Sequence, residues 1–341
     1  MKGRADLKPR VFVTREIAPE GIAKLAKHAR VEVWPRDTPP PYAELKRHAS
    51  EADALLTMVT DRIDAALIAS APMLRVISNL AVGLDNIDVA AATAAGVAVG
   101  HTPGVLTDAT ADLAFALLMA SARRVAEGDR EVRARRWRTW GPKVMLGRDV
   151  FGATLGIIGW GQIGRAMGRR GLGFNMRVLY AARTSRTRSS KDASDNRNAG
   201  AIEVPLSQLL KESDFVSLHV PLTPETKHLI GAKELAQMKR GAILVNTARG
   251  AVIDQLALSR ALESGHLGGA GLDVTDPEPI ARNDSLLKLP NVVITPHIGS
   301  ASYTSRRKMA EVAADNIIAV LKGNPPPFCA NPEVKIRPAI R

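Results

Sequence analysis

Residues 154–164 read Thr-Leu-Gly-Ile-Ile-Gly-Trp-Gly-Gln-Ile-Gly, in which an apolar β-type run leads directly into the pattern G-x-G-x-x-G. Glycines also punctuate ordinary turns, so the elements around the pattern decide its meaning. Here Gly159 allows a tight turn, Gly161 lets a pyrophosphate approach the backbone, and Gly164 lets the following helix pack closely on the strand. The stretch therefore predicts a dinucleotide site formed by Gly159, Trp160, Gly161, Gln162, Ile163 and Gly164.

The next strand predicts which dinucleotide binds. After the strand at 177–180, Ala182 stands 18 residues past Gly164, where a site selective for NAD carries an acidic residue for the ribose 2′-hydroxyl. Arg183 and Thr184 follow instead, and both can hold the 2′-phosphate of NADP. We therefore predict that Ala182, Arg183 and Thr184 bind the cofactor, with NADP(H) preferred and NAD(H) also accepted.

The composition is that of a globular protein with room for two domains. The chain has 341 residues, of which 45% are hydrophobic and 24% are charged. Residues 1–10 lack the apolar region of a signal peptide, and no apolar run reaches the roughly 18 residues of a spanning helix. The single cysteine, Cys329, excludes an intrachain disulfide and a cysteine-based metal site. We expect a cytoplasmic protein with no membrane contact and no bound metal.

The net charge of +13 raises the alternative of a nucleic-acid-binding protein. The excess of Lys and Arg is spread along the chain, however, and no recognition-module signature accompanies it. Residues 130–140 combine five arginines with Trp137 and Trp140, a pattern also typical of a surface or subunit-contact helix with packed indoles. We predict such a helix and no nucleic-acid partner. The charge would instead attract anionic cofactors and carboxylate substrates.

The first hundred residues predict a doubly wound parallel sheet. Apolar runs at 11–13, 31–33, 54–57, 76–78 and 97–100 alternate with segments of helical periodicity. The turn at 79–86 follows one of these runs, and Gly83 can leave backbone N–H groups free there. Ligands usually bind at the carboxyl ends of the strands in such sheets, so this turn is a candidate ligand site.

A second alternation of strands and helices begins after residue 152. Its predicted strands are 154–158, 177–180, 202–204, 215–220, 242–246, 269–273 and 292–295. Three helix starts are predicted: Thr107 as the cap of an apolar helix at 108–122, Thr223-Pro224-Glu225, and Asp254 as the cap of a helix ending at Gly265. An amphipathic helix at 303–321 is expected to return to the first domain.

These elements predict an α/β fold of two doubly wound parallel-sheet domains. A Rossmann dinucleotide-binding domain, residues 104–297, is inserted into a flavodoxin-like substrate domain, residues 1–103 and 298–341. Helix 108–122 is rich in Ala and Leu on more than one face, and together with Trp137 and Trp140 it exceeds what one domain should expose. We therefore predict a homodimer built through this helix and the two tryptophans.

Three loops at the predicted carboxyl edge of the second sheet carry polar side chains. They contain Arg249 at 246–250, Glu278 at 273–279 and His297 at 295–299. Taken singly, these residues read as a structural ion pair, a solvated turn residue and a hydrogen-bonded histidine at a strand end. Because the carboxyl edge faces the cofactor cleft, the three side chains can instead converge on a substrate beside the nicotinamide.

Together with the order of the domains, these motifs resemble the D-isomer-specific 2-hydroxyacid dehydrogenases over nearly the whole chain. Within that family, the stretches at 81–88 (AVGLDNID), 102–123 and 295–302 (TPHIGSAS) are most similar to glyoxylate reductases that also reduce hydroxypyruvate. The resemblance implies that Arg249, Glu278 and His297 are catalytic. It also implies further cofactor contacts at Thr107, His219, Val220, Pro221, Thr247, Ala248, Asp273 and Gly299, with Asp273 holding the nicotinamide carboxamide.

By the same resemblance, the backbone N–H groups of Val82 and Gly83 bind the substrate carboxylate. Leu56, Met58 and Val59 follow or end a strand of the same sheet and are candidates for a wall beyond the carbonyl carbon, although Met58 reads equally well as core filling. The chain departs from the family pattern at Trp160 and in the polar stretch 185–200. These departures concern the binding of the 2′-phosphate and not the chemistry.

The expected reaction is the reduction of glyoxylate and hydroxypyruvate to glycolate and D-glycerate. Hydride from C4 of the nicotinamide reaches the carbonyl carbon, so the carbonyl oxygen must receive a proton. His297 would donate this proton as general acid, because a carboxylate partner such as Glu278 favours the charged imidazole. Arg249 would hold the substrate carboxylate and polarise the carbonyl with its planar fork of donors.

Three alternatives stay open on the sequence. A nucleotide-sensing corepressor can share the fold and the three polar residues. Phosphoglycerate dehydrogenases are related enzymes, although 341 residues leave no room for the regulatory domain that some of them carry. Phosphite dehydrogenases resemble the chain as well, but they carry Lys where Val82 stands. In every case the expected ligand is small, and for the enzyme we favour it is a 2-oxo acid.

Overall fold

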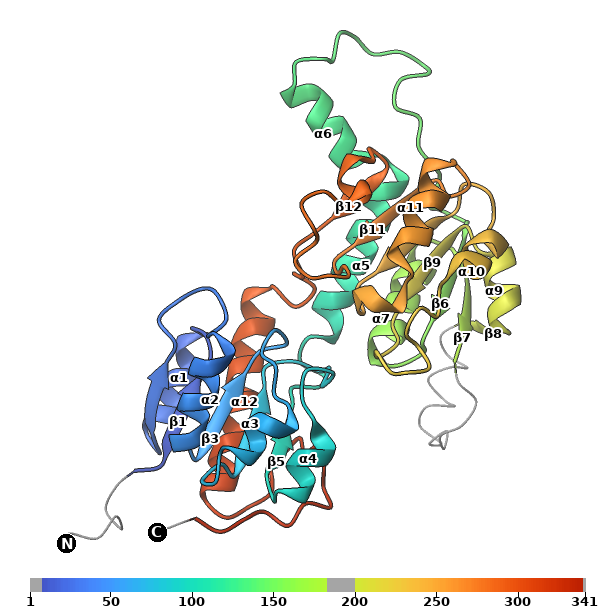
Figure 1. Cartoon of the computed structure of the whole chain (residues 1–341). Coiled ribbons are helices and arrows are strands. Elements are labelled where there is room, and N and C mark those ends of the chain that lie inside the picture. Colours follow the sequence, from blue (N-terminus) through green and yellow to red (C-terminus); the bar gives the residue numbers. More distant parts are fainter. Residues whose placement is uncertain (1–7, 183–199, 340–341) are drawn as a thin grey trace, which may run out of the picture. The chain divides into compact units, whose positions relative to one another are not determined.

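The structure, a computed structural model, describes residues 8–182 and 200–339. It divides into two compact units (Figure 1). The first unit runs to Leu106 and resumes at Ser300, and the second unit is Thr107–Gly299. Within the described ranges, no helix is both long enough and apolar enough to cross a membrane.

The first unit is a five-stranded parallel sheet in the order β2-β1-β3-β4-β5, which is the flavodoxin-like order. Helices α2, α3 and α4 pack on one face of this sheet around Phe12, Leu55 and Ile77. The strands are β1 (Arg10–Val13), β2 (Arg30–Val33), β3 (Ala54–Thr57), β4 (Val76–Asn79) and β5 (Ala98–Gly100). The helices are α1 (Pro19–Ala26), α2 (Tyr42–Glu51), α3 (Ala65–Ala69), α4 (Val89–Ala94) and α12 (Tyr303–Leu321).

Helix α12 returns to the first unit, as predicted, and packs on α1 and β4. Its bounds, Tyr303–Leu321, match the predicted range, and the side chain of Ser302 caps its first turn by accepting from the N–H of Ser305. Helices α1 and α12 approach very closely, because a Cβ at Gly21 would lie 2.9 Å from the Cβ of Ala310. The glycine is therefore required by the packing of these two helices.

The second unit is a seven-stranded parallel sheet in the order β12-β11-β10-β9-β6-β7-β8. The strand order reverses at β6, which has β7 on one side and β9 on the other, so the predicted Rossmann topology is confirmed. The strands are β6 (Thr154–Ile158), β7 (Arg177–Ala181), β8 (Ile202–Glu203), β9 (Phe215–Leu218), β10 (Ile243–Asn246), β11 (Gly269–Leu272) and β12 (Val292–Ile294).

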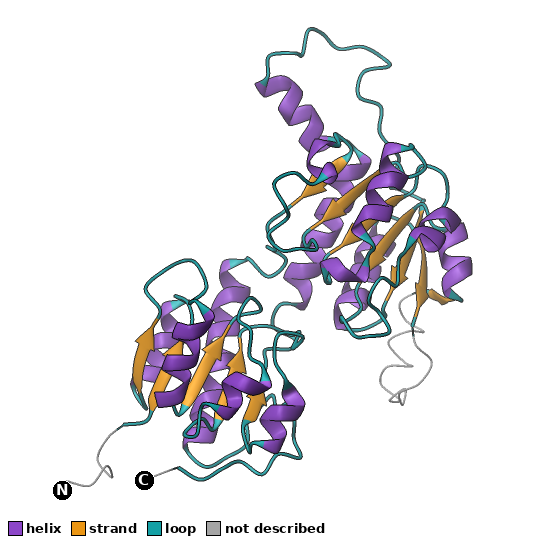
Figure 2. Ribbon diagram, viewed as in Figure 1, coloured by secondary structure: helices purple, strands orange, loops and turns teal. Residues whose placement is uncertain are grey.

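Helices cover both faces of this sheet (Figure 2). One hydrophobic cluster joins α5 and α7 to the sheet, and another joins α9, α10 and α11 to its other face. The helices are α5 (Thr107–Ala122), α6 (Val125–Arg133), α7 (Gln162–Gly173), α9 (Leu206–Glu212), α10 (Ala232–Gln237) and α11 (Gln255–Glu263), with short 3₁₀ turns η2 (Gly250–Val252) and η3 (Ser285–Lys288). Asp254 caps α11 by accepting from the N–H of Ala257, as predicted.

The environment of α5 corrects two expectations. The helix begins at Thr107, so this residue lies inside the helix and does not precede it as a cap. The apolar surface of α5 is covered by its own unit, since it packs on α7, β10 and β11. The contact with β11 is tight, because a Cβ at Gly271 would lie 2.9 Å from the Cβ of Leu117. Helix α5 therefore does not need a second subunit to bury it.

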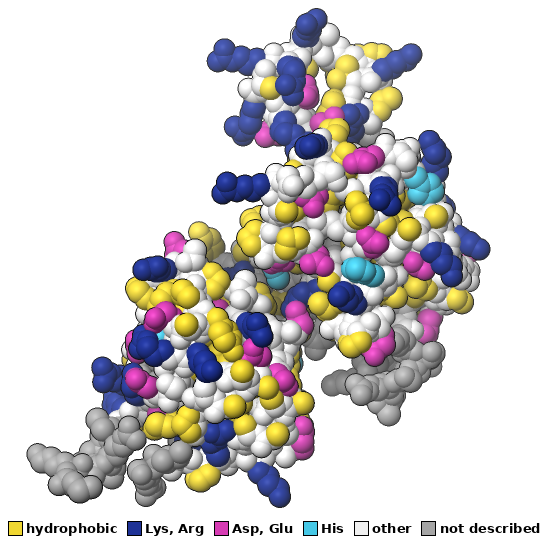
Figure 3. Space-filling model, viewed as in Figure 1, with side chains coloured by type: hydrophobic (Ala, Val, Ile, Leu, Met, Phe, Trp, Pro, Cys, Tyr) yellow, Lys and Arg dark blue, Asp and Glu magenta, His cyan; other side chains and the backbone are white. Residues whose placement is uncertain are grey.

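The predicted helix at 130–140 is wrong in its extent. Helix α6 ends at Arg133, and Arg135 has a positive φ of 58°, which ends a right-handed helix. Residues 134–149 form no helix or strand, and Trp137 and Trp140 are 65% and 79% exposed. We call residues 125–151 the α6 arm. It extends away from the rest of the second unit and is crowded with Lys and Arg side chains (Figures 2 and 3).

The predicted helix start at Thr223 is also wrong, because residues 224–228 form a turn. The hydroxyl of Thr226 donates to the carbonyl of Pro221 (2.6 Å) and accepts from the N–H of Thr223 (2.8 Å). His228 then adopts a left-handed backbone with φ of 52°. Side-chain bonds to the backbone thus compete with the helix that Pro224 and Glu225 favour.

Candidate active site

The turn after β6 has the geometry of a phosphate-binding loop. Gly159 has φ of 98°, and a Cβ there would lie 2.5 Å from the carbonyl oxygen of His219. A Cβ at Gly164 would lie 2.0 Å from the carbonyl oxygen of Gly159, so α7 can approach β6 only with glycine at this position. By contrast, a Cβ at Gly161 would meet nothing within 4 Å. This open space lies at the start of α7, whose first N–H groups have no partners within the helix and suit a pyrophosphate.

Trp160 contributes its backbone to this turn and its side chain to the core. The indole is 8% exposed and stacks on the ring of Tyr180, with centroids 4.4 Å apart and an interplanar angle of 15°. A Cβ at Gly168 would lie 2.6 Å from the indole, so α7 has a glycine where the ring packs. Trp160 therefore links the phosphate-binding turn to α7 and β7. Trp160, which departs from the family pattern, therefore has a packing role, because its buried ring is not available to a ligand.

The predicted 2′-phosphate site is described only in part. Ala182 is exposed directly after β7, the strand next to β6. Arg183 and Thr184 lie outside the described residues. Their binding of the 2′-phosphate stays a prediction.

Residues 219–221 follow β9, which pairs with β6 on the other side of the turn. The Nε2 atom of His219 lies 2.8 Å from the hydroxyl of Ser217. Burial lowers the pKa of His219 to about 4, so this imidazole is neutral at neutral pH. His219, Val220 and Pro221 therefore line the strand edge next to the phosphate-binding turn without adding a charge.

The loop after β10 is shaped by Asn246, which is fully buried. Its side-chain amide donates to the carbonyl of Arg249 (2.8 Å), and its oxygen accepts from the N–H of Ala248 (2.9 Å). The Arg249 side chain is half-buried and donates from Nη1 to the carbonyl of Ala248 (2.8 Å). The hydroxyl of Thr247 is buried and has no hydrogen-bond partner among the described residues. Asn246 thus holds the loop that carries Arg249.

Asp273 joins the loops after β11 and β12. Its carboxylate is 1% exposed and accepts from the hydroxyl of Thr295 (2.6 Å) and from the N–H groups of Ile298 (2.8 Å) and Gly299 (2.7 Å). Three of the roughly four acceptor positions of this carboxylate are therefore used within the unit. The N–H of Gly299 is also used here, so any cofactor contact of Gly299 has to come from its other atoms.

His297 and Glu278 form a close pair. The Nδ1 atom of His297 lies 2.5 Å from Oε1 of Glu278, and the two side chains are 29% and 34% exposed. His297 has φ of 54°, and its N–H points at the carbonyls of Asp273 (2.9 Å) and Thr295 (3.0 Å), which hold this strained backbone. Because an ionised carboxylate only accepts hydrogen bonds, Nδ1 carries the hydrogen, and Nε2 is the nitrogen left for proton exchange.

Arg249, Glu278 and His297 thus follow three adjacent parallel strands, β10, β11 and β12. The structure brings Glu278 and His297 into direct contact. It also packs the segment after Arg249 against the loop that leads to Glu278, since a Cβ at Gly250 would lie 2.0 Å from the carbonyl oxygen of Thr275. Thr107, at the start of α5, donates to Oε1 of Gln162 (3.3 Å) in the same unit.

In the first unit, two carbonyl groups of the loop after β4 contact side chains of the same unit. The buried amide of Asn79 donates to the carbonyl of Gly83 (3.0 Å) and accepts from the hydroxyl of Thr57 (3.0 Å). The Nδ1 atom of His101 lies 3.2 Å from the carbonyl of Val82. Among the described residues, the N–H groups of Val82 and Gly83 donate to no acceptor. Two adjacent free N–H groups at the carboxyl end of a strand suit a carboxylate.

The predicted apolar wall is wrong at Leu56. This side chain is fully buried, because β3 lies between β1 and β4 and is covered on both faces. Met58 is half-buried, and its backbone is held by Asp61 (2.7 Å) and Asn86 (2.9 Å). Val59 lines a pocket of about 410 Å³.

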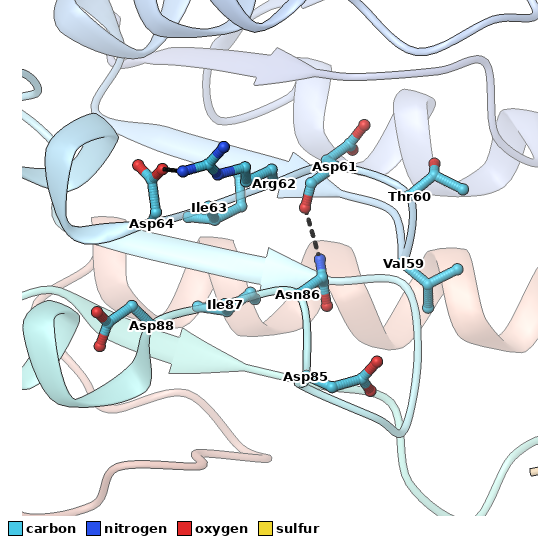
Figure 4. A pocket seen from close by; sticks show the side chains of 10 residues that line it. All are labelled: Val59, Thr60, Asp61, Arg62, Ile63, Asp64, Asp85, Asn86, Ile87 and Asp88. Atoms are coloured by element: carbon cyan, nitrogen blue, oxygen red, sulfur yellow. Dashed lines mark hydrogen bonds and ion pairs between the residues drawn. The ribbon is translucent and has the colours of Figure 1, made fainter. Parts of the chain in front are cut away.

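That pocket combines apolar side chains with four carboxylates and the guanidinium of Arg62, so its lining has a net negative charge (Figure 4). Asp61, Asp64, Asp85 and Asp88 contribute to its lining. Asp61 is 2% exposed and is held by hydrogen bonds from Thr14 and from the N–H of Met58. The carboxylates disfavour an anionic 2-oxo acid, so this pocket does not extend the proposed substrate site.

Sequence reasoning missed the residues that shape these loops. Asn79 and Asn246 each end an apolar strand and are fully buried, and a polar residue closing an apolar run is a signal that can be read from sequence. The sequence pattern places Thr295 at the end of a predicted strand without showing its partner, and it gives no sign of a role for Gln255. The contacts of these two residues depend on where other loops lie, which no local pattern shows.

The comparisons with known proteins agree with this geometry. The family model for the NAD-binding domain of D-isomer-specific 2-hydroxyacid dehydrogenases matches residues 115–299. The glyoxylate reductase of Korarchaeum cryptofilum is 52% identical over 334 residues, which cover 97% of this chain and 99% of that protein. A crystal structure of a Thermus thermophilus protein has a TM-score of 0.87 at 49% identity and covers 94% of this chain and 99% of its own.

A further solved relative carries ligands. The NADPH-dependent glyoxylate/hydroxypyruvate reductase of Sinorhizobium meliloti, in complex with NADP and malonate, has a TM-score of 0.83 at 29% identity. It covers 98% of this chain and 100% of its own. The open space above Gly161 and the strand-edge loops are the features that a nicotinamide dinucleotide requires. From the family match and the identity over nearly the full length, the chain belongs to the D-isomer-specific 2-hydroxyacid dehydrogenases and is a nicotinamide-dependent oxidoreductase.

Proposed function

We propose that the chain reduces glyoxylate and hydroxypyruvate to glycolate and D-glycerate, with NADPH as the preferred cofactor. The observation that carries the proposal is the contact between His297 and Glu278 on the strand-edge loops of the dinucleotide-binding sheet. It is supported by relatives that are named glyoxylate reductases and are about half identical in sequence.

The proposed chemistry uses three side chains and two backbone groups. When bound, the reduced nicotinamide supplies a hydride to the carbonyl carbon. His297 gives the proton on Nε2 to the carbonyl oxygen, so the product gains one hydride and one proton, while Glu278 stabilises the charged imidazole through Nδ1. Arg249 holds the carboxylate and polarises the carbonyl. The N–H groups of Val82 and Gly83 bind the carboxylate as well.

The proposed preference for NADPH rests on the residues after β7. Ala182 offers no carboxylate to a free 2′-hydroxyl, and Arg183 and Thr184 can bind a phosphate. The Sinorhizobium meliloti relative is described as NADPH-dependent and was solved with NADP. The preference for small acids rests on the named relatives and on the loop at 79–83.

A panel of 2-oxo acids tests the proposal. Oxidation of NADPH is followed by absorbance with glyoxylate, hydroxypyruvate, pyruvate and phenylpyruvate as substrates. The highest kcat/KM is expected for glyoxylate and hydroxypyruvate, the acids for which the relatives are named, with pyruvate slower and phenylpyruvate slowest. A higher kcat/KM for phenylpyruvate would refute the substrate assignment. Tight NADPH binding without reduction of any 2-oxo acid would indicate a nucleotide-sensing protein instead.

A further inference from the structure

We propose that Gln255 is a positioning residue that holds the loop carrying Glu278 and so sets the contact between Glu278 and His297. The inference rests on the proposed function for its kinetic consequence, whereas the positioning itself concerns the free protein. It gives the first residue of α11 a role that neither its sequence neighbourhood nor its exposure suggests.

The side-chain amide of Gln255 spans the Glu278 loop, which we define as residues 275–284. Its Oε1 atom accepts from the N–H of Asp276 (2.9 Å), and its Nε2 atom donates to Oδ2 of Asp284 (2.7 Å). Asp276 and Asp284 stand on either side of Glu278 in the chain. One half-buried amide therefore ties both ends of the loop to one point.

The rings of Pro277 and Pro279 restrict the backbone at the tip of the loop, but they do not tie the tip to a neighbouring element. Residues 276–279 are exposed, so apolar burial does not hold them. At the near end, the hydroxyl of Thr275 donates to the carbonyl of Pro277 (2.8 Å), and Gly250 lets the carbonyl of Thr275 approach. At the far end, Asp284 accepts from the N–H of Leu286 (2.9 Å). The bonds of Gln255 connect these two anchors.

Helix α11, which carries Gln255, is held firmly in the second unit. Helix α11 is capped by Asp254, and it buries Leu258 and Leu262 in the core of the second unit. A second contact joins the same helix to the far end of the loop, since the hydroxyls of Ser259 and Ser285 lie 2.7 Å apart. The segment that follows Arg249 thus supports both ends of the Glu278 loop: Gly250 packs against its near end, and α11 contacts its far end.

The contacts require an amide. A neutral amide accepts and donates at the same time, which the two partners of Gln255 demand. A carboxylate of nearly the same shape keeps the bond from the N–H of Asp276 but faces the carboxylate of Asp284, and like charges at that separation repel. Gln255→Glu is therefore a near-isosteric way to break one end of the tie.

The partner of that carboxylate provides a rescue. In the double variant Gln255→Glu with Asp284→Asn, the new carboxylate accepts from the new amide, so the bond is restored with donor and acceptor exchanged. The Asn oxygen can still cap η3, because Asn caps helices as well as Asp does. Gln208→Glu is the matched control, since Gln208 donates to Glu212 at the same distance of 2.7 Å on the exposed face of helix α9.

We expect Gln255→Glu to lower kcat for glyoxylate about tenfold, which is part of the ~10² to 10⁴ that a general acid supplies, and to leave the KM for NADPH nearly unchanged. The pH profile of kcat should shift as well. The double variant should recover kcat to within about twofold, and Gln208→Glu should match the native protein.

A readout without substrate separates this proposal from the proposed function. The ring of His297 is titrated by NMR in the free protein, where loosening of Glu278 shifts the titration of Gln255→Glu and the double variant restores it. If the native protein fails to reduce glyoxylate, the proposed function fails while the NMR comparison still judges Gln255. Native kcat and native His297 titration in Gln255→Glu, or no recovery in a folded double variant, would overturn the positioning role.

Discussion

The second unit exposes two kinds of loop, and they are built in opposite ways. The strand-edge loops with Glu278 and His297 are partly exposed but tied down by bonds from Asp273, Thr275 and Gln255. The α6 arm exposes Trp137 and Trp140, and its ion pairs, such as Arg133 with Asp129 and Arg136 with Glu131, are local. Exposure with dense bonding indicates a site ready for a small ligand. Exposed indoles without such bonding indicate a surface that a larger partner covers.

The largest expected effect is on the stability of the dimer, when the two indoles of the α6 arm are replaced. We predict a homodimer in which the α6 arm contacts a second copy, because Trp, Val and Leu side chains at this exposure exceed what a monomer usually shows. Replacing Trp137 and Trp140 together by Ser should weaken the dimer about a thousandfold, since buried interface indoles each contribute ~2 kcal/mol or more.

Sedimentation velocity at micromolar concentration measures this effect. The native chain should sediment as a dimer and the double variant as a monomer. Tyr303→Ser removes a fully exposed aromatic ring outside the arm and should leave the dimer intact. A native chain that is monomeric at micromolar concentration would show that the arm has another purpose.

The next largest effect is expected on kcat, when His297 or Glu278 is replaced. His297→Ala should lower kcat at least ~100-fold, because general acid catalysis supplies a factor of ~10² to 10⁴, while the Kd for NADPH changes little. Glu278→Gln should shift the pH optimum, since it removes the carboxylate that faces Nδ1. Steady-state kinetics with glyoxylate, combined with NADPH fluorescence for binding, measure both. Near-native turnover of His297→Ala would remove the proposed mechanism.

A further prediction concerns the choice between NADPH and NADH. We predict roughly a tenfold to hundredfold higher kcat/KM with NADPH than with NADH, because a charge-assisted bond from Arg183 to the 2′-phosphate would be worth about 1.5 to 3 kcal/mol. Arg183→Ala should remove most of this ratio. Equal kcat/KM values with the two cofactors, or a ratio that Arg183→Ala leaves intact, would contradict the prediction.

The fold was predictable because its signals are local and agree with one another. The apolar run at 154–158, the glycines after it and the periodicity at 303–321 specify strand, turn and helix without reference to distant residues. The prediction failed at Thr223, where the bonds of Thr226 hold a turn, and at Leu56, where a residue expected in the site lies in a strand covered on both faces.

The candidate site was predictable where strand order alone brings residues together. Glu278 and His297 follow adjacent parallel strands, so placing their loops at one edge was enough to pair them. Gln255 could not be found in this way, because its role depends on the return of the chain from Asp276 to Asp284. What covers Trp137 and Trp140 could not be predicted for a similar reason, since both indoles are exposed within the chain and composition does not tell which surface covers an indole.

The smallest expected effect distinguishes two histidines of the second unit, His297 in its exposed pair and His219 beside the phosphate-binding turn. Burial lowers the pKa of His219 to about 4, whereas an unfolded histidine titrates near 6.5. Above pH ~6.5 the ring is neutral in both states, so it contributes no pH dependence. Between pH ~6.5 and ~4 the unfolded chain binds a proton that the folded protein does not bind, and stability is lost as the pH falls. Because the side chain is half-buried, we expect a loss of only about 1 to 2 kcal/mol. Urea unfolding at pH 7.5 and pH 5 measures it: His219→Gln should reduce the difference between the two pH values, and His28→Gln, on the surface of the first unit, should not. If His219→Gln leaves that difference unchanged, the ring of His219 is charged in the folded protein at pH 5, and the edge beside the phosphate-binding turn is more accessible to water than its packing indicates.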